Sequence, residues 1–229
     1  MIGIIGALAA EMQVLIAELD GRKSITCGNL VFETGTLFGH EAILGVCGAG
    51  KVNAAVFTDA MIHLKNPDYI INLGVAGALD NRLNIGDIVV ADCCVEHDMD
   101  TTPVGDPYGY ISGIGIVEMG CDKNLIERLM KAAQKNKTIM AYTGMIATGD
   151  QFIASKKQKE NILSHFEAMA CEMEGGAIVH ACLLRGVPCA VVRSMSDKAD
   201  GSAHMDFPQY LQLAARNSAA LIKAFCEIG

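Results

Sequence analysis

The stretch MIGIIGALAAEMQVLIAEL (residues 1–19) carries the pattern that decides the fold class. Its first six residues form an apolar, β-branched run, which predicts a buried strand. The residues behind this run are apolar at the spacing of one helix face: Met12, Leu15, Ile16 and Leu19. A buried strand that leads directly into an amphipathic helix is the repeating unit of an α/β protein.

The same alternation continues to the end of the chain. Further strands are predicted over residues 30–38, 42–47, 69–73, 88–95, 168–171 and 189–192 and around Ile146, the first two forming an antiparallel hairpin. Further helices are predicted over residues 52–64, 156–165 and 174–184, from a cap at Asp122 to Ala133, and from the capping-box pattern Asp206-Phe207-Pro208-Gln209 onward. Residues 96–120 lack a helical period and predict a long functional loop. Because no repeat or linker divides the chain, residues 1–229 are predicted to form a single α/β domain with a mixed central sheet surrounded by helices.

The composition excludes several classes of protein. Hydrophobic residues make up 51% and charged residues 19% of the chain, which is too apolar for a disordered protein. The net charge of −8 is spread without a basic face, so no nucleic-acid partner is expected. The longest stretch without a charged residue, 138–149, is shorter than the roughly 18 residues of a membrane span, so no membrane association is expected.

The nine cysteines are interpreted as small apolar packing residues, because they form no C-x-x-C pair and are scattered among apolar residues. No basic segment precedes the first apolar run, so the N-terminus does not resemble a secretion signal. Together these features predict a protein of the reducing cytoplasm.

Charged residues gather at four predicted strand ends that also carry glycine or a helix start. These are Glu11; Glu172 and Glu174 around Met173; Arg193, Ser196 and Asp197; and Asp150 after Gly149. In open α/β sheets, such ends converge on the crevice that binds the ligand. Each residue also has a structural interpretation. The helix dipole alone favours Glu11 and Glu174, Ser196 and Asp197 can cap a turn, and Phe152 and Phe207 can be core residues. Arg193 at the end of an apolar strand needs an anionic partner.

The glycine-rich segments do not match a nucleotide-binding motif. GIIGA (3–7) is not G-x-G-x-x-G, and GAGK (48–51) lacks the spacing of a P-loop. In NLGVAGAL (72–79), the backbone of Val75, Ala76 and Gly77 either approaches a ligand or turns the chain. The group His97, Asp98 and Asp100 resembles a metal cluster only in composition, and a solvated loop is the simpler interpretation. No metal and no cofactor are predicted.

Taken together, these segments resemble the 5′-methylthioadenosine/S-adenosylhomocysteine nucleosidases of the nucleoside phosphorylase/hydrolase superfamily. The combination of Glu11, EMEG (172–175) and RSMSDKAD (193–200) is the specific part of the resemblance. The matching segments are GIIGALAAEM (3–12), GAGKVNAA (48–55), IINLGVAGAL (70–79), IGDIVVAD (85–92), TGDQFI (148–153), EMEGGAIVHAC (172–182) and VVRSMSDKAD (191–200). The resemblance therefore covers essentially the whole chain and implies a nucleoside phosphorylase-like fold.

The resemblance implies hydrolysis of the N-ribosidic bond of methylthioadenosine and S-adenosylhomocysteine, and also of 5′-deoxyadenosine, with release of adenine for methionine salvage. Asp197, oriented by Ser196, would protonate N7 of adenine, a general acid step. Glu11, supported by Arg193, would polarise the attacking water. Glu174 would accept hydrogen bonds from the ribose hydroxyls.

The remaining implied contacts surround the nucleoside. Met173 would pack beneath the sugar, Phe152 would stack on the base, the Ile153 backbone would bind the base edge, and Phe207 would close over them. Leu8 would lie near the 5′ group, and Val75 stands where many relatives have Ser or Thr. The family is homodimeric, and the loop at 96–109 would reach into the neighbouring site.

Three alternatives stay open from the sequence. An aminofutalosine nucleosidase would use the same residues on a different nucleoside. A purine nucleoside phosphorylase would need cations to bind phosphate. The first glycine-rich segment instead carries Glu11, and NLGVAGAL (72–79) carries no arginine, the nearest being Arg82. A nucleoside-binding protein without catalysis would need neither Glu11 nor Asp197.

Overall fold

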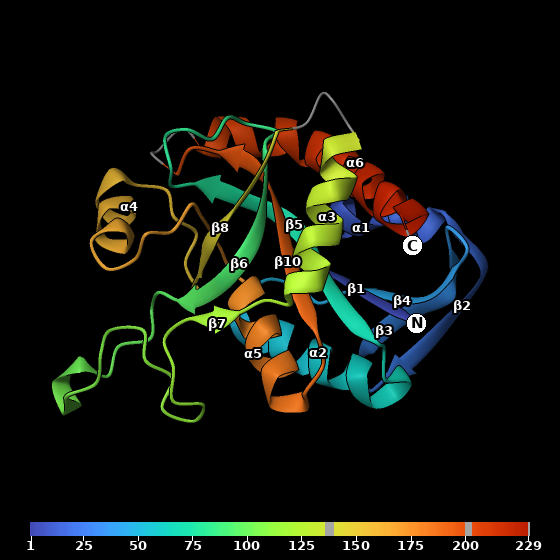
Figure 1. Ribbon diagram of the computed structural model, residues 1–229, viewed down its shortest axis with the longest axis horizontal. Coiled ribbons are helices and arrows are strands. Elements are labelled where there is room, and N and C mark those ends of the chain that lie inside the picture. The colour runs from blue at the N-terminus through green and yellow to red at the C-terminus, as the bar shows by residue number, and fades with distance from the viewer. Residues whose placement is uncertain (136–139, 200–202, 229) are drawn as a thin grey trace.

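One continuous mixed sheet forms the centre of the computed structural model, which describes residues 1–135, 140–199 and 203–228, with only the backbone described over 203–209 (Figure 1). Its strands are β1 (Ile2–Gly6), β2 (Leu19–Cys27), β3 (Leu30–Leu37), β4 (His40–Val46), β5 (Tyr69–Ala78), β6 (Ile88–Glu96), β7 (Met119–Gly120), β8 (Ala141–Thr148), β9 (Ala170–Glu172) and β10 (Cys189–Asp197). The helices are α1 (Ala9–Ala17), α2 (Lys51–Lys65), the short 3₁₀ helix η1 (Thr102–Val104), α3 (Lys123–Lys135), α4 (Lys156–Leu163), α5 (Gly175–Arg185) and α6 (Ala203–Ile228). The predicted fold class is thereby confirmed.

The sheet closes on itself over part of its width. The strand order is β10-β6-β8-β9-β5-β1-β4-β3-β2, and β10 also pairs with β5 in parallel. Strands β5, β10, β6, β8 and β9 therefore form a closed ring, from which β1, β4, β3 and β2 extend as an open sheet. Because β5 pairs in parallel with β1 on one side and with β10 on the other, the carboxyl ends of the three strands meet at one edge, where a ligand crevice is expected.

Helices cover both faces of this sheet, as Figure 1 shows. Helices α1, α3 and α6 pack on one face around a core that includes Leu15, Leu129 and Phe225. Helices α2 and α5 pack against each other and on the other face, around a core that includes Phe57 and Ile178. All five residues of β1 are buried, which agrees with a strand covered on both faces.

Most predicted elements are present, but strand β2 (Leu19–Cys27) was not predicted, and η1 and β7 lie within the predicted loop at 96–120. The other differences lie at the ends of the elements. Strand β10 continues to Asp197 instead of stopping at residue 192, because its polar residues stay paired with β5. Leu19 begins β2 instead of closing the face of α1. The last helix begins at Ala203, so the predicted start at Asp206 is wrong: neither glycine nor proline occupies 203–205 to stop the helix there. The cap at Asp122 is confirmed, since its carboxylate accepts the N–H of Leu125 at 2.9 Å.

Candidate active site

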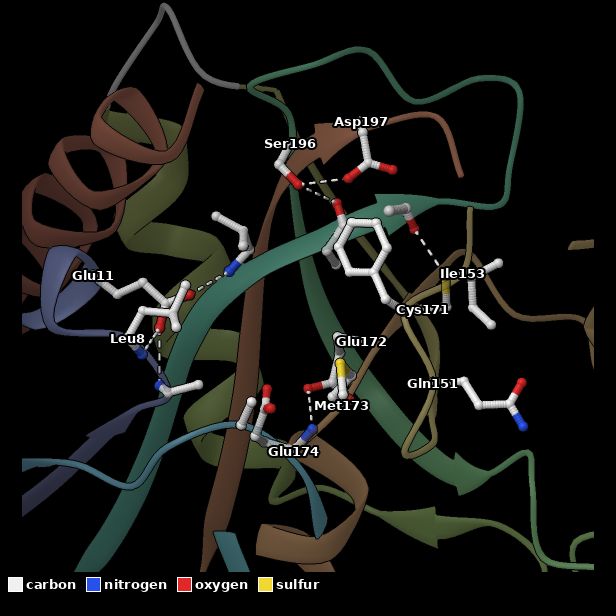
Figure 2. A pocket seen from close by; sticks show the side chains of 16 residues that line it. Leu8, Glu11, Gln151, Ile153, Cys171, Glu172, Met173, Glu174, Ser196 and Asp197 are labelled. Atoms are coloured by element: carbon white, nitrogen blue, oxygen red, sulfur yellow. Dashed lines mark hydrogen bonds between the residues drawn. The ribbon is translucent and has the colours of Figure 1, made fainter. Parts of the chain in front are cut away.

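A cavity of about 280 Å³ opens at the edge where β1, β5 and β10 end. Figure 2 shows the side chains that line it. The lining residues are Ala7, Leu8, Glu11, Ala49, Val75, Ala76, Gly77, Gln151, Phe152, Ile153, Cys171, Glu172, Met173, Glu174, Ser196 and Asp197. The cavity thus brings together residues from six segments that the sequence analysis treated separately.

Glu11 lies in the first turn of α1 with its carboxylate fixed by backbone donors. Its Oε2 accepts the N–H groups of Ala7 (2.9 Å) and Leu8 (2.8 Å), and its Oε1 accepts that of Val75 (3.1 Å). Burial raises the pKa of Glu11, although these hydrogen bonds and the charge of Arg193 act in the opposite direction. A fixed carboxylate with a raised pKa is suited to accept a proton.

Asp197 lies on a separate wall of the cavity from Glu11, as Figure 2 shows. Its Oδ2 accepts the hydroxyl of Ser196 (2.8 Å), and its Oδ1 accepts the N–H of Ala199 (2.8 Å). The pairing of β10 with β5 shifts register between Met195 and Asp197, and such a bulge re-aims the side chains that follow it. The Ser196–Asp197 pair therefore owes its orientation to an irregularity at the end of the strand.

Arg193 lies behind the cavity and is paired with Glu172. Its Nε (3.1 Å) and its Nη2 donate to Oε2 of Glu172, and Nη2 also donates to Oδ1 of Asn72 at 2.6 Å. Burial alone would raise the pKa of Glu172, but the guanidinium and the hydroxyl of Thr148 outweigh it and lower that pKa. The anionic partner expected for Arg193 is thus mainly Glu172, while Glu174 lies 3.9 Å from its Nη2.

Glu174 immediately precedes α5 and has an unusual electrostatic environment. Burial and the nearby charge of Glu172 raise the pKa of Glu174 to about 7, although Arg193 opposes the shift. Its Oε1 accepts the N–H of Gly50 at 2.9 Å. The side chain of Glu172 accepts the N–H groups of Glu174 and Gly175, so it is Glu172 that stabilises the N-terminus of the helix.

The other predicted site residues divide into two groups. Leu8, Val75, Ala76, Gly77, Ile153 and Met173 line the cavity, and so does Phe152, a residue that is 45% exposed. The side chain of Phe207 lies outside the described part of the chain.

Sequence reasoning missed several residues that shape the site. Cys171, Gln151 and Ala49 line the cavity, and nothing in their types marks them as functional. Gly74 has a clearer signal: a Cβ there would come 3.0 Å from Oε1 of Glu11 and 3.2 Å from Nη1 of Arg193. Its glycine-rich segment was recognised, but the need for glycine at that residue depends on what packs against it.

The charges of the cavity restrict its ligands. Four carboxylates line it (Glu11, Glu172, Glu174 and Asp197), and the described lining residues include no lysine, arginine or histidine. Within the described residues no group of three His, Cys, Asp or Glu side chains is arranged to hold a metal ion. A phosphate dianion would meet negative charge here, whereas a neutral nucleoside and a water molecule would meet hydrogen-bond acceptors.

The comparisons with known proteins agree with this geometry. The family model described as "Phosphorylase superfamily" matches residues 1–227. A nucleosidase of Staphylococcus aureus (strain JH9), named for 5′-methylthioadenosine and S-adenosylhomocysteine, is 40% identical over 225 residues, 98% of each chain. The chain belongs to this nucleosidase family of the phosphorylase superfamily.

Solved structures extend the comparison. A 5′-methylthioadenosine/S-adenosylhomocysteine nucleosidase of Neisseria meningitidis, in complex with methylthio-immucillin-A, has a TM-score of 0.96 at 33% identity and covers 100% of this chain and 99% of its own. The futalosine hydrolase of Helicobacter pylori has a TM-score of 0.94 at 34% identity and covers 100% and 97%. The membership in the family thus rests on sequence and on fold.

The part of the chain that the structure describes holds no helix long and apolar enough to cross a membrane. Seven of the nine cysteines are buried, and Cys27 and Cys93 are half-buried. This burial agrees with the interpretation of the cysteines as packing residues.

Proposed function

We propose that the chain hydrolyses the N-ribosidic bond of 5′-methylthioadenosine and S-adenosylhomocysteine, and of 5′-deoxyadenosine, and releases adenine. The observation that carries the proposal is the pair of carboxyl groups, Glu11 and Asp197, on separate walls of a cavity whose described lining holds no cation. In hydrolysis an acid protonates the leaving group while a base on the other side of the bond accepts a proton from the attacking water, so the two groups need to be apart.

Asp197 acts on the leaving group. One carboxyl oxygen delivers a proton to N7 of adenine while the C1′–N9 bond breaks and its electron pair passes to the purine. Ser196 and the N–H of Ala199 keep the carboxyl in place. General acid assistance of this kind contributes on the order of 10²–10⁴ in rate.

Glu11 acts on the water. The oxocarbenium-like sugar that remains is captured at C1′ as the water oxygen forms the new bond and passes a proton to Glu11. The raised pKa of Glu11 makes it a stronger base, and three backbone N–H groups fix its orientation. Val75 supplies one of those N–H groups, so residue 75 holds the Glu11 carboxylate through its backbone.

The remaining residues bind the nucleoside. Glu174 accepts the ribose 2′- and 3′-hydroxyls, and Met173 packs beneath the sugar. Phe152 stacks on adenine, the backbone of Ile153 binds its edge, and Leu8 contacts the 5′ substituent, all from positions that line the cavity. Arg193 acts from behind, by holding Glu172 and by its charge on Glu11.

A second candidate is the nucleosidase that cleaves 6-amino-6-deoxyfutalosine. It is favoured by one observation, the similarity to the futalosine hydrolase of Helicobacter pylori. The acid, the base and the ribose contact would be the same, so only the 5′ side of the cavity separates the two substrates.

The protein is proposed to act as a homodimer in the cytoplasm, in methionine salvage. Apolar side chains are exposed on the adjoining faces of α2 and α5: Val52 (74%), Val56 (55%) and Leu184 (64%). They border a groove of about 1020 Å³, and burying such a patch against a second copy is favourable. Val104, 81% exposed in η1, extends from the loop at 96–109 that would reach the neighbouring site.

The dimer is tested by light scattering, which should give twice the monomer mass for the unmutated protein and the monomer mass for Leu184→Asp. A monomeric unmutated protein contradicts this proposal.

The activity is tested by following adenine release from methylthioadenosine in buffer without phosphate. Glu11→Gln and Asp197→Asn should each lower kcat at least about a hundredfold, whereas Glu41→Gln, an exposed acid on β4, should leave it unchanged. A strict requirement for phosphate, or near-normal kcat in either site variant, contradicts the mechanism. Rates on S-adenosylhomocysteine, aminodeoxyfutalosine, adenosine and inosine identify the preferred substrate.

A further inference from the structure

Three residues outside the cavity form a closed ring of hydrogen bonds. The backbone N–H of Lys51 donates to Oδ1 of Asp150 (2.7 Å), and the backbone N–H of Asp150 donates to Oδ2 of Asp98 (2.8 Å). The ammonium group of Lys51 then donates to Oδ1 of Asp98 at 2.7 Å. The ring joins the start of α2, the loop after β6 and the loop after β8.

The ring lies next to both halves of the nucleoside site. Gly50, directly before Lys51, donates its N–H to Glu174, the proposed ribose contact. Asp150 directly precedes Gln151, Phe152 and Ile153, which line the cavity on the proposed base side. Gly50 has a φ of 96°, and a Cβ there would come 3.0 Å from Oδ1 of Asp150, so the turn fits closely against the ring.

The ion pair within the ring is better shielded from water than an ordinary surface pair. The side chains of Lys51 and Asp98 are each only 17% exposed, and Lys51 also donates to Glu96 at 3.1 Å. Burial alone would raise the pKa of Asp98, but the ammonium and the N–H of Asp150 outweigh it and lower that pKa. Charged hydrogen bonds shielded from water hold their geometry better than exposed ones.

The catalytic pair does not depend on the ring. Glu11 is fixed by Ala7, Leu8 and Val75, and Asp197 by its neighbours on the chain. A change in the ring should therefore alter how the nucleoside is held and leave the acid and the base in place.

We propose that Lys51, Asp98 and Asp150 are positioning residues that couple the ribose contact at Glu174 to the base-binding segment 151–153. None of the three lines the cavity, and they act through Gly50 and through the backbone that follows Asp150. The inference rests on the proposed function for the identity of the two half-sites.

The test compares Lys51→Met, Lys51→Arg and a matched control, Arg22→Met. The control removes another partly buried ion pair, between Arg22 and Glu33 on β2 and β3, far from the cavity. Lys51→Met should raise KM for methylthioadenosine about tenfold or more, a change near 1.4 kcal/mol, with kcat within about threefold. Lys51→Arg should restore most of the affinity, and Arg22→Met should leave KM unchanged. A Lys51→Met variant that loses kcat at unchanged KM overturns the proposal, since that result indicates only a smaller folded fraction.

A second measurement tests the coupling without turnover. Calorimetry gives the Kd of adenine alone, which does not touch the ribose contact. Lys51→Met should weaken adenine binding, and its effect on KM should be less than additive with that of Glu174→Gln. Unchanged adenine affinity, or fully additive effects, overturns the coupling. Because adenine binding needs no catalysis, this result stays separate from a failure of the hydrolase assignment.

Discussion

The protonation of Glu174 should make nucleoside affinity depend on pH. The pKa of this carboxyl is raised to about 7 by burial and by the charge of Glu172. Only the ionised carboxylate presents both oxygens as acceptors to the two ribose hydroxyls, because one oxygen of the protonated acid carries a hydrogen. Affinity should therefore increase as the pH rises through about 7, and not as it falls.

The size of the effect follows from the titration. With a pKa of about 7, the acid outnumbers the carboxylate about tenfold at pH 6, and the ratio is reversed at pH 8. If only the carboxylate binds the hydroxyls, the Kd should fall about tenfold between these two pH values, or about 1.4 kcal/mol. In Glu174→Gln the affinity should be weaker at high pH and this part of the pH dependence should vanish.

The assay is calorimetric binding of a non-hydrolysable C-nucleoside analogue of methylthioadenosine, measured from pH 6 to pH 8. The matched control ligand is the same analogue without its 2′- and 3′-hydroxyls. Titration of Glu11, whose pKa is also raised, acts on both ligands and therefore cancels in their ratio. The reasoning is refuted if both ligands show the same pH dependence, or if Glu174→Gln keeps the full dependence of the unmutated protein.

Two further predictions concern the residues behind the cavity. Gly74→Ala should lower kcat about tenfold or more, because the new Cβ would come 3.0 Å from Glu11 and 3.2 Å from Arg193. The control is Gly120→Ala, whose Cβ would have no atom within 4 Å. Equal kinetics in the two variants would contradict the close packing at Gly74. Arg193→Met should lower the free energy of unfolding by about 3–5 kcal/mol, because it leaves the Glu172 charge buried without its main partner. Denaturant unfolding should show part of that loss restored in the double variant with Glu172→Gln, and an equally unstable double variant would argue against the ion pair as the cause.

The sequence was sufficient for most of the elements and for the residue types at their ends. Apolar runs and helical spacing are local properties, so β1, α1 and the β3–β4 hairpin follow from residues close together in the chain. The same holds for Glu11 and Glu174, which stand at helix starts next to glycine or a strand end.

The sequence pattern could not predict which residues distant in the chain become hydrogen-bond partners. Arg193 was expected to need an anion, but its choice of Glu172 and of Asn72, 121 residues away, depends on the pairing of β10 with β5. The requirement for glycine at 74 has the same origin, since it reflects the side chains that β10 and α1 bring against that residue.

What the sequence by itself determined is therefore most of the strands and helices and the polar strand ends, because short-range periodicity encodes them; β2, whose residues are mostly polar and exposed, was not among them. Only the tertiary structure decided that β5 and β10 close part of the sheet into a ring, and that a register shift after Met195 re-aims the side chains at the end of β10. The physical reason is that register and closure are set by packing between distant segments, and a one-residue shift in pairing changes the face to which every following side chain points.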